Sequence, residues 1–307
     1  MPLVGLRDRS GTCLTWDQIK SGDGDFEDPP VILLSHFQNR EPYCDFSVTE
    51  LINDPYSLQM TRRLPYYESP DDIMDRLIGI SLHKCIEQTG RDNEDTGAHQ
   101  ESEYKLSIRN KGKAYTVGGR SDLTMVVADT MWDWKSFSTF KVRMVVKGEI
   151  GDAFDDVTKQ LNMYRFLRHI NGGQLVTNLR VRIICKDWRF YEFRQAGYDI
   201  NRYPRGAVVP LDVWPVEKTK KFIEKRVAAH AQALEISRAC KSIEELPTAL
   251  MPVGMCDTWD GKYGRLRCEW YCPVKDRCPF WLAACNERDS KPQEVKVPPA
   301  KRTPRRK

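Results

Sequence analysis

Two aspartates and a lysine occur within residues 118–136, where apolar and polar side chains alternate. The alternation predicts two β-strands joined by a turn at Ala128-Asp129. Asp122 belongs to the first strand, and Asp133 and Lys135, two residues apart, share one face of the second. Carboxylates among apolar residues are unfavourable unless they pair or bind a metal ion. Their oxygens suit a divalent cation, and a lysine beside it can hold a water molecule or a phosphate oxygen. The sequence therefore predicts metal-assisted hydrolysis of phosphodiesters.

The spacing of these residues resembles a known motif. Gly119-x-x-Asp122, with Asp133-x-Lys135 eleven positions further on, is similar to the core of the PD-(D/E)XK nucleases. The likeness is greatest to the RecB-like exonuclease branch, which includes CRISPR-associated and phage-encoded exonucleases. It implies that Asp122 and Asp133 hold one or two Mg²⁺ or Mn²⁺ ions, with the main-chain carbonyl of Trp134 as a further ligand. Lys135 would position the attacking water and help to deprotonate it. The alternative is a surface Asp–Lys pair on an ordinary hairpin.

Two predicted helices carry further candidate residues. Residues 71–90 have the apolar spacing of a helix, with His83 on its apolar side. This histidine is either a core residue bonded to a carbonyl or, as the resemblance implies, the metal-site histidine that precedes the G-x-x-D strand. In the second helix, residues 152–170, Gln160 lies beside the apolar stripe one turn before Tyr164. The pair matches the Q-x-x-x-Y motif of the RecB-like branch, which implies that it supports the site and touches nucleic acid. The alternative is a glutamine at the edge of the stripe and a core tyrosine.

Five of the ten cysteines fall within thirty residues near the C-terminus. Disulfides are rare in cytosolic proteins, so this density indicates metal binding. Four of them are expected to ligate one centre, either an iron–sulfur cluster of the [4Fe–4S] type or a tetrahedral zinc ion. Their C-x5-C spacing resembles the cluster segment of RecB-like iron–sulfur nucleases, although C-x3-C replaces the usual C-x2-C, and Asp54-Pro55 stands where many relatives have Cys-Pro. The expected ligands are Cys256, Cys268, Cys272 and Cys278, with Cys285 in reserve.

The composition is that of a globular protein. The 307 residues are 40% hydrophobic, and no run of roughly 18 apolar residues is present that would span a membrane. The first residues lack the apolar core of a signal peptide, so we expect a cytoplasmic protein of a bacterial or phage-infected cell. The net charge is +5, but residues 290–307 alone carry +6, which leaves −1 for the rest. This basic, proline-rich tail is expected to be disordered and to contact nucleic-acid phosphates.

The order of the elements predicts the fold class. Residues 103–117 read as a hairpin that leads to the Asp122 strand, Leu179–Cys185 and Arg189–Phe193 as two further strands, and residues 217–239 as a long helix. We expect an α/β fold, a mixed central sheet flanked by helices as in a restriction-endonuclease-like core. The predicted domains are an N-terminal segment (1–45), a nuclease core (46–245), a C-terminal Cys-ligated metal module (246–286) and the tail (287–307).

These expectations combine into one function. The chain is predicted to be a Mg²⁺- or Mn²⁺-dependent DNA exonuclease that acts on single-stranded ends in replication, recombination or repair. A structure-selective endonuclease of the junction-resolvase type is the enzymatic alternative, and a non-cutting nucleic-acid-binding protein is the alternative from another class. No G-x-x-x-x-G-K-[ST] sequence is present, so a helicase or recombination protein would have to supply unwinding.

Overall fold

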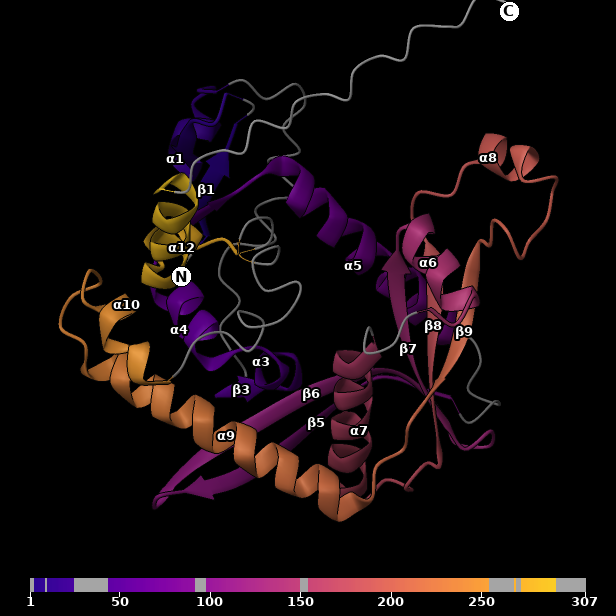
Figure 1. The fold of residues 1–307 in the computed structure, drawn as a ribbon. Helices are drawn as coiled ribbons and strands as arrows, with labels where there is room; N and C mark the ends of the chain where they lie inside the picture. Colours follow the sequence, from indigo (N-terminus) through magenta and orange to yellow (C-terminus); the bar gives the residue numbers. More distant parts are fainter. Residues whose placement is uncertain are drawn as a thin grey trace, which may run out of the picture.

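The computed structural model describes residues 3–8, 10–24, 44–91, 98–149, 154–253, 268 and 272–290. Within these residues the chain forms a six-stranded sheet, a separate three-stranded sheet and helices that pack against both (Figure 1). The predicted fold class is therefore confirmed at the level of a mixed α/β structure with helices beside mixed sheets.

One long strand, β6, organises the six-stranded sheet. β5 pairs with β6 antiparallel along almost its whole length. On the other side, β3 pairs parallel with the middle of β6, and β7 pairs antiparallel with its last residues. β8 lies parallel to β7, and β9, antiparallel to β8, forms the edge. The strands are β3 (Phe46–Ser47), β5 (Ala98–Asn110), β6 (Lys113–Met125), β7 (Thr130–Phe137), β8 (Asn178–Cys185) and β9 (Gly206–Leu211).

The main core lies between this sheet and four helices, α3, α6, α7 and α9. α7 crosses the sheet in the middle of Figure 1, and α9 runs below it. α7 is buried on nearly all sides, and even Arg165 is satisfied inside, because its Nε donates to the carbonyl oxygen of Val176 at 2.5 Å. The helices around this sheet are α3 (Val48–Ile52), α4 (Pro55–Arg63), α5 (Pro70–Arg91), α6 (Thr139–Val146), α7 (Asp155–Ile170), α8 (Phe190–Gln195) and α9 (Val216–Ala239).

Two smaller cores lie at the ends of the chain. In the three-stranded sheet β1 pairs parallel with β4, so the N-terminal segment is joined to residues that follow α4. A second cluster joins α4 and α9 to the C-terminal helices and contains Val274 and Cys278. The elements are β1 (Leu3–Arg7), β2 (Cys13–Thr15), α1 (Trp16–Lys20), β4 (Tyr66–Glu68), α10 (Leu246–Ala249), η4 (Met251–Val253), η5 (Lys275–Arg277) and α12 (Pro279–Ser290).

The predicted helices at 71–90, 152–170 and 217–239 are confirmed as α5, α7 and α9, and the 103–117 hairpin as part of β5 and β6. The predicted strand Arg189–Phe193 is wrong, because these residues begin the helix α8. Trp188 packs on Phe193 with ring centroids 5.4 Å apart. An extended strand would separate residues five apart by roughly 16 Å along its axis, so this contact excludes a strand here. The second partner of β8 comes later in the chain, as β9.

The described helices include none that has both the length and the apolar composition to cross a membrane.

Candidate functional site

The two aspartates of the predicted motif lie on adjacent strands. β6 and β7 pair with Leu123 opposite Trp132, so Asp122 and Asp133 come next, just beyond the paired residues. Oδ2 of Asp122 accepts a hydrogen bond of 2.9 Å from the main-chain N–H of Trp134. This bond fixes the Asp122 carboxylate against the strand that carries Asp133.

Asp133 and Lys135 form a close pair inside the protein. The Asp133 residue is 1% exposed. Nζ of Lys135 lies 2.9 Å from its Oδ2 and donates to its Oδ1 at 3.1 Å. Oδ2 nevertheless has no hydrogen bond of acceptable geometry among the described residues. A buried carboxylate oxygen in this state can accept a further ligand.

The electrostatics of this pair follow from burial. Burial raises the pKa of Asp133 to about 6, against the attraction of Lys135, with the negative charge of Asp122 adding to the rise. For Lys135, burial alone would lower the pKa, but the Asp133 carboxylate and its hydrogen bond outweigh burial and raise it. Lys135 is therefore an ammonium group at neutral pH, a donor and a positive charge.

His83 reaches the site from α5, which contacts β7. Its Nδ1 lies 3.3 Å from Oδ1 of Asp122. The hydrogen bond to Asp122 raises the pKa of His83, although burial acts in the opposite direction. The structure places His83 beside the carboxylate of Asp122, and its assignment as the metal-site histidine stays a prediction.

Gln160 and Tyr164 extend the connected set from α7. Oε1 of Gln160 accepts from Nζ of Lys135 at 3.4 Å, and Nε2 of Gln160 donates to the hydroxyl of Tyr164 at 3.0 Å. Both ends of the glutamine amide are thus used, as a polar group next to a core requires. Burial raises the pKa of Tyr164, so its hydroxyl stays protonated.

Two residues lie close to Tyr164 in a way that the sequence analysis did not predict, Gly119 of the motif and Thr49. Gly119 lies on β6 where a Cβ atom would come within 2.7 Å of Cε1 of Tyr164 and 2.8 Å of Cγ2 of Val48. Thr49 on α3 also acts on the tyrosine hydroxyl and lowers its pKa, against the larger effect of burial. A glycine inside a strand is a sign of close approach, so Gly119 could have been found from its place in the motif. Thr49 carries no such sign.

The six side chains therefore meet, but they do not form a ready-made metal cage. No group of three or more His, Cys, Asp and Glu side chains suited to a metal ion occurs among the described residues. Trp134 takes part through its N–H, and nothing in the contacts assigns its carbonyl oxygen a role. The donors present are carboxylate oxygens and an imidazole, a set that suits Mg²⁺ or Mn²⁺ better than a soft metal.

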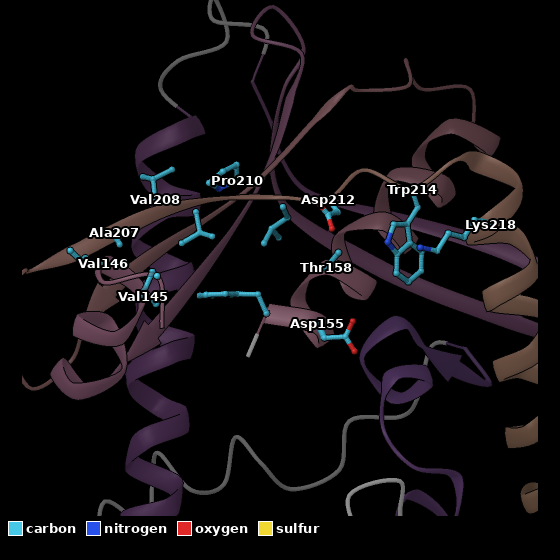
Figure 2. Close-up of a pocket in the computed structure, with 14 residues that line it drawn as sticks. Val145, Val146, Asp155, Thr158, Ala207, Val208, Pro210, Asp212, Trp214 and Lys218 are labelled. Atoms are coloured by element: carbon cyan, nitrogen blue, oxygen red, sulfur yellow. The ribbon is translucent and has the colours of Figure 1, made fainter. Parts of the chain in front are cut away.

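Hollows also occur elsewhere on the described surface. One of about 780 Å³ opens between the end of α6, the start of α7 and the edge strand β9. Figure 2 shows Asp155 and Thr158 of α7 at its wall, with Trp214 and Lys218 on the side of α9. None of the six predicted residues lines it. Its Lys218 is engaged with the ring of Trp214, 4.2 Å from its Nζ. The connected set, which joins two carboxylates to a lysine and a histidine, remains the better candidate for chemistry.

The predicted cysteine centre is not confirmed. Cys256 lies outside the described residues. Cys268 and Cys278 are buried and Cys272 is half-buried, and Cys278 packs in the cluster that joins α4 to the C-terminal helices. The described residues, with these three cysteines among them, contain no group of three or more His, Cys, Asp and Glu side chains suited to a metal ion. Asp54 caps α4 by accepting from the N–H of Ser57 at 2.9 Å.

Comparisons with known proteins add little. No protein-family model matches the chain, and the search of curated proteins finds no significant match. Among solved structures, "Crystal structure of SSO0001" is similar with a TM-score of 0.46 and 15% sequence identity, over 81% of this chain and 93% of that chain. A likeness this distant identifies neither a family nor an activity.

Proposed function

We propose that the chain is a metal-dependent deoxyribonuclease with a PD-(D/E)XK-type site on a restriction-endonuclease-like core. The observation that carries the proposal is the unbroken set of contacts from His83 through Asp122 to the strand of Asp133 and Lys135, and on to Gln160. These residues come from two strands and two helices that are far apart in sequence. An ordinary surface pair would not draw in a half-buried glutamine and a histidine.

The acidic pair fits a divalent metal ion. Asp133 has a buried oxygen without a hydrogen bond among the described residues. The negative charge of Asp122 repels that of Asp133 and adds to the rise in the pKa of Asp133. A hard cation bound by both carboxylates offsets this repulsion and stabilises their ionised forms. Asp122 and Asp133 would hold the metal, with His83 beside them. The metal would supply charge stabilisation and an acidified water at the phosphate.

The chain's own residues then have distinct roles. Lys135 carries the positive charge next to Asp133 and orients an oxygen of the water or the phosphate by donating to it. The Asp133 carboxylate, against the effect of burial, raises the pKa of Lys135, which suits this donor role. Gln160 holds the Lys135 ammonium, and Tyr164 holds Gln160. His83, hydrogen-bonded to Asp122, can donate a proton or a hydrogen bond to the leaving oxygen.

The burial of Asp133 supports a chemical role over a structural one. A raised pKa means that the ionised carboxylate is less stable in the fold than in water. A scaffold would gain stability by replacing it with an apolar residue. Perturbed carboxylates of this kind are concentrated at functional sites.

The remaining features of the proposal come from the sequence. They are action on single-stranded DNA ends, a [4Fe–4S] cluster or zinc ion held by the C-terminal cysteines, and a helicase or recombination protein as partner. The cysteine centre would be structural, because a closed four-thiolate site offers no position for substrate.

The test is a nuclease assay with a matched control. Asp133→Asn and Lys135→Ala should each lower cleavage of end-labelled single-stranded DNA in Mg²⁺ or Mn²⁺ by roughly 100-fold or more. Asp156→Asn, at an exposed position in the first turn of α7, should cleave as wild type does. Circular single-stranded DNA in a parallel reaction separates an exonuclease, which leaves it intact, from an endonuclease. Wild-type rates for Asp133→Asn would end the assignment.

A further inference from the structure

We propose that a basic, aromatic surface formed by α6, α8 and the loop before β9 binds the backbone and bases of a single nucleic-acid strand outside the catalytic site. We call it the α6–α8 surface and define it by Arg143, Lys147, Arg189, Tyr191 and Arg202. It encloses a hollow of about 830 Å³. The inference rests on the proposed function for its purpose but not for its test, because binding is measured without cleavage.

The charge of the hollow is mainly positive. Four cationic side chains and one carboxylate, that of Glu192, line it, and all four cations are exposed. Among the described residues neither Arg143 nor Arg189 forms an ion pair, while Lys147 and Arg202 have only distant partners, at 3.8 Å and 3.9 Å. Guanidinium groups without acids to neutralise them are a site for phosphate oxygens.

Exposed aromatic rings stand beside these charges and select the kind of anion. Phe190, Tyr191 and Tyr198 are 59%, 68% and 56% exposed. Tyr191 is oriented by a hydrogen bond of 2.8 Å from Nε2 of Gln195. Duplex DNA hides its base faces, whereas a single strand offers them for stacking on aromatic rings next to a basic groove. Phosphate-binding arginines with exposed rings therefore favour a single strand over a duplex or an acidic peptide.

The surface is held by a small aromatic core. The ring of Trp188 lies 5.4 Å from that of Phe193 and 5.9 Å from that of Tyr203, and the guanidinium of Arg205 covers it at 4.1 Å. The main-chain N–H of Arg189 donates to the hydroxyl of Tyr203 at 3.3 Å. These contacts fix the start of α8, so its arginine and tyrosine are presented from a supported element and not from a free loop.

The sheet connects this surface to the candidate site. β7 and β8 are parallel, with Phe137 opposite Cys185 at their ends. α6 follows β7, and α8 follows β8, so both helices begin at the same end of these strands. α8 lies beyond that end in Figure 1. Thr139 ties the two connections together by donating its N–H to Asp187 at 2.5 Å. Lys135 is two residues from the end of β7, so a strand bound on the α6–α8 surface approaches the end of the sheet that carries the site.

The experiment measures binding of the full chain to a fluorescein-labelled oligothymidylate in EDTA, where no cleavage occurs. Arg143→Gln/Arg189→Gln should weaken binding about tenfold or more at low salt and reduce the slope of log K against log salt by about 1.4, the value for two phosphate contacts to a single strand. Tyr191→Ala should weaken single-strand binding roughly 5- to 150-fold and change duplex binding by less than about twofold.

The matched control removes two charges elsewhere. Lys105→Gln/Arg109→Gln, both exposed on β5, should bind as wild type does. The inference is overturned if Arg143→Gln/Arg189→Gln keeps the wild-type affinity and salt slope, if a duplex of the same sequence binds more tightly than the single strand, or if an oligoglutamate peptide binds more tightly than either. The two proposals can fail separately. If the wild type cleaves no DNA in Mg²⁺ or Mn²⁺ but the arginine variant still loses binding, the nuclease is refuted and the binding surface stands.

Discussion

Acidification should destabilise the protein through one histidine outside the candidate site. His230 on α9 is 0% exposed and packs against Phe46 with ring centroids 5.6 Å apart. Its Nε2 lies 3.1 Å from the carbonyl oxygen of Asn53 and 3.3 Å from the guanidinium of Arg226. Its Nδ1 is buried without a hydrogen-bond partner among the described residues. A second proton, on Nδ1, would therefore be a buried charge beside an arginine.

The magnitude follows from the two protonation equilibria. Burial, followed by the charge of Arg226, lowers the pKa of His230 to about 3 in the folded protein, against about 6.5 in the unfolded chain. Below about pH 6.5 His230 binds a proton in the unfolded chain, whereas in the folded protein it stays neutral until the pH approaches 3. Stability is thus fully present above pH 6.5 and is lost as pH falls. Between pH 7 and pH 5 the loss from this residue is about 2 kcal/mol.

The assay is urea unfolding followed by tryptophan fluorescence at about pH 7 and pH 5. His230→Gln keeps an amide that can donate to the Asn53 carbonyl but cannot take a charge, so it should lose about 2 kcal/mol less than wild type on acidification. His169→Gln makes the same change at an exposed position near the end of α7 and should behave as wild type. If His230→Gln and wild type lost the same free energy within about 0.5 kcal/mol, the account of a buried neutral histidine would be refuted.

Three further predictions concern the site, the cysteines and the tail. Gly119→Ala forces a methyl group against Tyr164 and Val48 and should lower the free energy of unfolding by about 1–3 kcal/mol, with an unchanged urea midpoint as the contrary result. Cys272→Ser should lower the melting temperature and the bound iron or zinc if the cysteines share a centre, and equal metal content and melting temperature would remove that centre. Deletion of residues 290–307, which carry +6, should weaken DNA binding most at low salt, and an unaltered salt dependence would show that the tail makes no phosphate contact.

The elements that carry the site could be predicted because their patterns are local. Alternation marks β6 and β7 on either side of the Asp129 turn, where a positive φ of 47° closes the hairpin. The spacing of Asp133 and Lys135 fixes their common face whatever the rest of the fold does. The likeness to a known motif then suggested His83 and Gln160, and the structure brings both to the pair. Their meeting depends on tertiary packing that no local pattern contains.

The features that were missed depend on long-range contacts. The segment at Arg189 has the aromatic composition of a strand. The ring of Trp188 packs on the rings of Phe193 and Tyr203, and the helix α8 begins between Trp188 and Phe193. The N-terminal strand β1 pairs with β4, more than fifty residues away. Periodicity describes one element at a time and cannot choose its partners.

In the described part of the chain, buried polar atoms without a hydrogen bond are concentrated on the strands of the candidate site, and one of them belongs to Asp133. Seven buried side-chain atoms lack a hydrogen bond among the described residues, and five of these lie on β6 and β7 between Ser121 and Trp134. A native protein usually satisfies such groups, because each one left unpaired costs about 1–3 kcal/mol. Strand alternation places Thr124 and Asp133 on the face of the acidic pair and the other three on the opposite face. Of these atoms only Oδ2 of Asp133 is an anionic acceptor that a metal ion would stabilise. A ligand that meets this demand should raise the melting temperature of the wild type, and Asp133→Asn should lose that rise even where its own stability is unimpaired. Thermal shifts in Mg²⁺ and Mn²⁺ would measure the difference, and an equal rise in both proteins would place the metal elsewhere.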